Sequence, residues 1–134
     1  MNPILKNILA LIAGCVVGSL VNMSLIMLSG SVIPPPDGAV VTTTEGLKAS
    51  MQLFEPKHFI MPFLAHALGT LAGAFVCVKI AASNHLILAF LVGLLFFMGG
   101  LASVLMLPSP VWFSFLDLVV AYFPMAYLGY RMAR

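Results

Sequence analysis

The chain has 134 residues, of which 62% are hydrophobic and only 7% charged, and its formal net charge is +2. Soluble domains contain roughly 25% charged residues, so this composition indicates an integral membrane protein whose first partner is the lipid bilayer. The few cations are not clustered on a basic face, which excludes nucleic acid as a partner.

Four apolar runs are long enough to cross a bilayer, which needs about 20 residues per helix. They lie at about residues 8–28, 59–80, 86–107 and 111–132. The sequence therefore predicts an all-α fold: a polytopic membrane protein with a four-transmembrane-helix bundle, forming one domain over residues 1–134. The one long loop, residues 29–58, leaves no room for a soluble domain.

The N-terminal stretch "MNPILKNILALIAGC" has two readings. Lys6 followed by an apolar run and "IAGC" is similar to a bacterial lipoprotein signal that ends at Cys15. However, "VVGSLVNMSLIML" continues the apolar run to spanning length. We therefore expect the first run to be a retained transmembrane helix.

The long loop contains a predicted short amphipathic helix at about residues 43–54. Thr42 and Glu45 fit a capping box, and apolar residues follow at helical spacing until Pro56 prevents continuation. Two roles remain open for this helix, an interfacial anchor or a lid over the bundle. The expected rim of such a lid consists of Glu55, Lys57 and His58.

The positive charges predict the orientation. Lys6, Lys79, Arg131 and Arg134 lie near the two termini and the "AASNH" turn, so the positive-inside rule places both termini in the cytoplasm. The long loop and the "LPSP" turn then face outward. The overall form resembles small bacterial membrane proteins, so we expect a multi-pass protein of the cell membrane, specifically the bacterial inner membrane.

Three polar residues fall at one predicted depth. Asn22, His66 and Asp117 lie six or seven residues from the outer ends of their runs, or about 9 to 11 Å below the boundary. A carboxylate in hydrocarbon costs about 2.5–3.5 kcal/mol on insertion scales, which a histidine at equal depth would offset. We therefore predict that Asp117 pairs with His66 and that Asn22 completes the network. Thr70 and Ser114 share the polar stripes and are further ligand-binding candidates.

Small residues on the same stripes predict close helix approach, as membrane helices require. Pro124 predicts a kink in the fourth helix that frees the carbonyl of Val120. The glycines expected at helix contacts are Gly14, Gly18, Gly69, Gly73, Gly93 and Gly100.

Three functions remain open. The first is binding or transport of a proton, ion or small polar ligand at the polar layer, with a homo-oligomer or a shared cavity completing the pathway. The second is a structural or accessory subunit of a larger membrane complex, in which the polar cluster is a helix clamp. The third and weakest is a lipid-acting enzyme. No nucleotide loop, serine-nucleophile motif or zinc signature occurs, so the sequence predicts no cofactor, metal or catalytic residue and favours a protein that is not an enzyme.

Overall fold

The structure, a computed structural model, describes residues 1–134 and contains helices but no strands. Four stretches are long and apolar enough to cross a membrane: Pro3–Val32, Pro56–Ile80, His85–Met106 and Val111–Ala133. The predicted all-α, four-span fold class is therefore confirmed. The elements are α1 (Pro3–Val32), α2 (Thr44–Ser50), η1 (Met51–Leu53), η2 (Pro56–Phe59), α3 (Ile60–Ile80), α4 (His85–Met106), α5 (Val111–Val120) and α6 (Phe123–Ala133).

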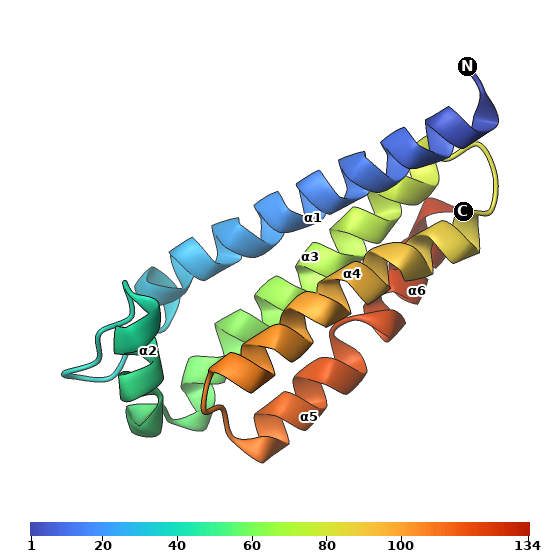
Figure 1. The fold of residues 1–134 in the computed structure, drawn as a ribbon. Coiled ribbons are helices and arrows are strands. Elements are labelled where there is room, and N and C mark those ends of the chain that lie inside the picture. Colours follow the sequence, from blue (N-terminus) through green and yellow to red (C-terminus); the bar gives the residue numbers. More distant parts are fainter.

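Both chain termini lie at one end of the bundle, beside the turn between α3 and α4, and α2 lies at the opposite end (Figure 1). We call these the terminal end and the loop end. Helix α3 is central and packs against α1, α4 and α6, whereas α1 lies at the edge and contacts α3 almost exclusively. An even number of spans requires that the two termini lie at the same end.

Helix α1 is longer than the predicted 8–28, because the polar segment "SGSV" near its end is still helical. It approaches α3 through glycines. A Cβ built on Gly14 would lie 2.5 Å from the carbonyl oxygen of Gly73, and one on Gly18 would lie 2.7 Å from that of Gly69. Such contacts exclude any larger side chain without separating the helices.

The fourth span is interrupted rather than kinked. Helix α5 ends at Val120 and α6 begins at Phe123, with Ala121 and Tyr122 in a turn between them. Pro124 lies in the first turn of α6, where a missing N–H group costs nothing because those donors have no intrahelical partner. The disturbance of the fourth helix lies at Ala121 and Tyr122, directly ahead of the predicted kink at Pro124.

Helix α2 and the short η1 that follows it, together called the loop helix, pack on the end of the bundle. Its N-cap is Thr43, whose Oγ1 accepts a hydrogen bond from the Gly46 N–H at 3.0 Å, so the predicted cap at Thr42 was one residue early. Met51 is buried with Phe59 and Phe113, and two partly buried residues, Leu47 and Phe54, pack against them. The apolar side of the segment therefore covers the loop end.

Candidate functional site

Asp117 and His66 form a buried ionisable pair between α5 and α3. His66 Nδ1 lies 2.8 Å from Asp117 Oδ1 and 3.0 Å from Oδ2. An ionised carboxylate can only accept, so with Asp117 ionised the shared proton lies on Nδ1. The Asp117 side chain is 4% exposed, whereas that of His66 is 23% exposed. The structure thus brings the predicted pair together.

Tyr122 is a third member of the cluster that the sequence did not reveal. Its hydroxyl donates to Asp117 Oδ2 at 3.1 Å, and its ring stacks on His66 with 6.0 Å between centroids. The Tyr122 ring is buried against Gly100, where an added Cβ would lie 2.5 Å from Tyr122 Cζ. The space beside Gly100 is therefore filled by the tyrosine ring. Aromatic residues are common in apolar spans, so nothing in the sequence singled out Tyr122.

A space of about 210 Å³ adjoins this cluster and opens to the surface beside the exposed residues Gly99 and Ser103; we call it the inner cavity. It is bounded by α1, α3, α4 and the Tyr122 turn. This space is large enough for several water molecules, since each occupies about 30 Å³ in the liquid. Its lining residues are Asn22, His66, Phe96, Gly99, Gly100, Ser103 and Tyr122.

Asn22 enters this cavity but does not complete the predicted network. A Cβ on Gly69 would lie 3.0 Å from the Asn22 Cβ, so Asn22 is level with Gly69, about 4.5 Å along α3 from His66. The structure contains no hydrogen bond from Asn22 to the pair, and its Oδ1 is buried without any partner. Buried acceptors without a partner are rare, so this one calls for an explanation.

Two further spaces lead from the pair toward the loop end. A middle cavity of about 160 Å³ has both Asp117 and His66 in its wall and shares His66, Gly100 and Ser103 with the inner cavity. It also shares Leu47 and Phe54 with a pocket of about 460 Å³ at the loop end. Neighbouring spaces with shared wall residues therefore lie between the pair and the underside of the loop helix.

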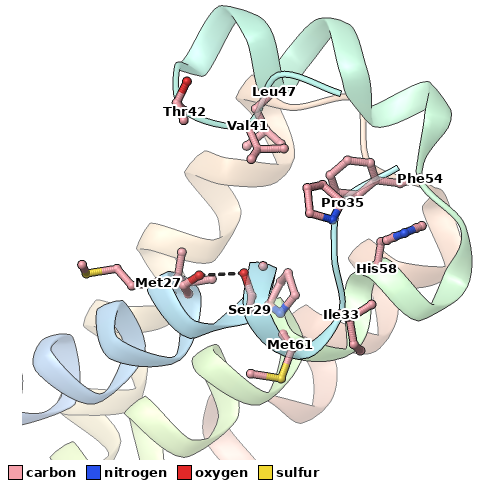
Figure 2. Close-up of a pocket in the computed structure, with 13 residues that line it drawn as sticks. Met27, Ser29, Ile33, Pro35, Val41, Thr42, Leu47, Phe54, His58 and Met61 are labelled. Atoms are coloured by element: carbon pink, nitrogen blue, oxygen red, sulfur yellow. Dashed lines mark hydrogen bonds between the residues drawn. The ribbon is translucent and has the colours of Figure 1, made fainter. Parts of the chain in front are cut away.

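The largest of these spaces, the loop pocket, is mainly apolar. Figure 2 shows Leu47, Val41 and Phe54 on one side of it, with Met27 and Met61 from the ends of α1 and α3 on the other. Ser29 contributes no free donor, because its hydroxyl bonds to the Ile26 carbonyl at 2.6 Å. The other polar side chains of the pocket are those of Thr42 and His58.

Thr70 and Ser114 do not join the cluster. Thr70 is fully buried, and its hydroxyl donates to the backbone carbonyl of His66 at 2.8 Å. Ser114 is half-buried on α5, and its side chain makes no hydrogen bond with the pair. As ligand-binding residues, both therefore have less support than Asn22.

The predicted rim residues lie at the loop end. Glu55 and Lys57 form an exposed ion pair of 3.6 Å. His58 Nδ1 accepts from the Glu55 backbone N–H at 2.8 Å, and His58 lines the loop pocket. Of the three residues only His58 lines the pocket, and none of them bonds to the His66–Asp117 pair.

No family model, curated protein or solved structure matches this chain. The fold and the site together define the class of protein. It is a multi-pass helical membrane protein that carries a largely buried Asp–His–Tyr cluster beside a partly open cavity.

Proposed function

We propose that the chain binds, and in an assembled form transports, a proton, ion or small polar ligand at the inner cavity. The observation that carries this proposal is that His66, whose Nε2 is not bonded, lines a space of about 210 Å³ together with the polar residues Asn22 and Ser103. His66 Nε2 has no partner within the chain, because only Nδ1 is bonded to Asp117.

The arrangement is typical of a histidine base held in a fixed orientation, rather than of a polar cluster that only joins two helices. Asp117 fixes the orientation of the imidazole through Nδ1, which leaves Nε2 able to gain or lose a proton or to bind a ligand. A helix clamp needs the Asp117 contacts but neither a cavity beside the histidine nor an unsatisfied amide oxygen. Ionisable residues within membrane spans are functional candidates because placing their charge in hydrocarbon costs free energy.

The adjoining cavities support access from the loop end. Leu47 and Phe54 line both the middle cavity and the loop pocket, so movement of the loop helix would connect the pair with the surface. This observation favours the lid role of that helix. With both termini in the cytoplasm the ligand would enter from outside. The chain is small for a transporter, so a complete pathway would require a second copy.

The accessory-subunit alternative keeps one observation in its favour. Asp117 is fully satisfied by His66 and Tyr122, as a static clamp between α3 and α5 would require. Under this alternative the inner cavity is dry and inaccessible.

Access of water to Asn22 distinguishes the binding or transport function from the accessory-subunit alternative. We would place Asn22→Cys in a Cys15→Ala, Cys77→Ala background and add a membrane-impermeant thiol reagent from outside. Labelling at Asn22→Cys is expected, whereas Leu20→Cys, whose native side chain is 62% exposed on α1, should stay unlabelled because it faces lipid. Absence of labelling at both sites in a folded protein would favour the clamp.

A further inference from the structure

The loop pocket has the lining of a site for an apolar chain. Its volume is about 460 Å³, within the range of about 300–1,000 Å³ that is usual for small-molecule sites. One wall comes from the last turns of α1 and the first turn of α3, and the other comes from the loop and the loop helix (Figure 2). Water would find few hydrogen-bond partners here, and an empty space of this size leaves its walls without contacts. The pocket therefore favours an apolar occupant.

The mouth of the pocket is apolar as well. Met27 on α1 lines the pocket although it is 77% exposed, and Val41 in the loop is exposed too. Gly30 is exposed in the same wall as Met27, and a Cβ built on it would meet nothing within 4 Å. Met61, by contrast, lines the pocket but is only 8% exposed. The pocket thus extends from apolar side chains at the surface to a buried methionine.

The bilayer itself supplies an occupant of this kind. The α1 wall, which includes Ile26 and Met27, belongs to the membrane-spanning stretch Pro3–Val32, so the mouth lies beside the acyl chains of the nearest leaflet. A methylene group and a water molecule each take about 30 Å³, so the pocket has room for roughly fifteen methylene groups, the greater part of one chain. We infer that the loop pocket binds one acyl chain of a bilayer phospholipid.

The charges around the pocket favour recognition of the chain rather than of the headgroup. The loop between α1 and α3 contains three carboxylates and two lysines, which give a net charge of −1, so an anionic headgroup gains no attraction there. The charged residues are Asp37, Glu45, Lys48, Glu55 and Lys57. A zwitterionic lipid such as phosphatidylethanolamine is therefore a sufficient ligand.

This lipid site is separate from the inner cavity, goes beyond the proposed function and does not depend on it. Leu47 and Phe54 line both the loop pocket and the middle cavity. An acyl chain in the pocket would pack against these two residues. The bound lipid would thus stabilise the position of the loop helix over the bundle.

The test is photolabelling of the protein in nanodiscs of phosphatidylethanolamine that include the same lipid with a diazirine in one acyl chain. Peptide mass spectrometry then maps the labelled residues. Labelling of Met61 is expected, because lipid on the outer surface of the bundle does not reach this buried side chain. Met98, which is 54% exposed on α4, should be labelled by the surrounding lipid in every variant, and the fully buried Cys77 in none.

Two glycine variants show whether the label arrives through the pocket. Gly30→Leu places a side chain in the open space at the pocket wall and should abolish the labelling of Met61. Gly99→Leu is the matched control and should leave that labelling unchanged, because a Cβ on Gly99 also meets nothing within 4 Å but the residue does not line the loop pocket. Val41→Trp, at the mouth, replaces Gly30→Leu if thermal unfolding shows that the latter is not folded.

An unlabelled Met61 beside a labelled Met98, or undiminished labelling of Met61 in Gly30→Leu, would overturn the inference. Labelling of Met61 by a photoactivatable free fatty acid but not by the phospholipid would overturn it too, because the chain would then not come from a bilayer lipid. The proposed function is tested independently by thiol labelling of Asn22→Cys, so the two can fail separately.

Discussion

Tyr122 donates a hydrogen bond to Asp117 across the interruption between α5 and α6, with 3.1 Å between the hydroxyl and Oδ2. In a continuous helix, residues five apart point about 140° from each other, so the two side chains could not meet readily. The turn at Ala121 and Tyr122 returns the tyrosine to the face of Asp117. The break in the fourth span therefore builds the third member of the cluster.

Removing this hydroxyl should destabilise the protein measurably. Tyr122→Phe keeps the ring on His66 and Gly100 but takes one donor from a buried carboxylate, so we expect a loss of about 1 kcal/mol in the free energy of unfolding. Thermal unfolding in detergent measures it. Tyr127→Phe is the matched control, since Tyr127 is 43% exposed and its hydroxyl only accepts a bond from exposed Arg131. Equal losses in both variants would argue against the Tyr122–Asp117 bond.

Two adjacent glycines in α4 offer a test of the ring position. A Cβ on Gly100 would overlap the Tyr122 ring and hydroxyl, whereas one on Gly99 meets nothing within 4 Å. Gly100→Ala should therefore cost about 1–3 kcal/mol through overpacking, and Gly99→Ala should leave stability unchanged. The comparison needs only the midpoints of thermal unfolding. A neutral Gly100→Ala would show that Tyr122 does not occupy this space.

The contact between α1 and α3 should depend on single glycines. Gly14→Ala places a methyl group 2.5 Å from the Gly73 carbonyl oxygen, and Gly30→Ala, in the same helix, meets open space. We expect Gly14→Ala to separate the helices and lower stability by about 1–3 kcal/mol. Spin-label distances between α1 and α3 would report the displacement. An unchanged distance and stability would contradict the close approach.

The Asp117–His66 pair should show energetic coupling. A double-mutant cycle of Asp117→Ala and His66→Ala is expected to give about 1–2 kcal/mol, near the upper range measured for interhelical bonds in membranes. The exposed contact between Arg134 and His85, at 3.3 Å, is the control cycle and should give at most about 0.5 kcal/mol. Coupling no larger than in the control would mean that the pair adds nothing to the fold.

The sequence predicts those features of the fold and site that a single large free-energy cost determines. Spans follow from apolar length, and the juxtaposition of His66 with Asp117 follows from the cost of leaving a carboxylate alone in hydrocarbon. The depth of Asn22 was misjudged because it was counted from Leu28, whereas α1 continues to Val32. Helix ends with weak signals are hard to locate to within a turn.

Other features depend on contacts that no local pattern encodes. The role of Tyr122 arises from a turn ahead of Pro124, and a proline signals that a helix is disturbed without telling whether it bends or stops. Thr42 and Thr43 are equally good caps by composition.

The central claim is that Asp117 holds His66 through Nδ1 and leaves Nε2 open to the inner cavity. Its most direct test is the ¹⁵N spectrum of His66 in a His58→Gln, His85→Gln background, in which it is the only histidine. At pH 8 we expect a protonated Nδ1 and an unprotonated Nε2, with this tautomer preference lost in Asp117→Asn. A proton on Nε2 with Nδ1 bare, unchanged by Asp117→Asn, would contradict it.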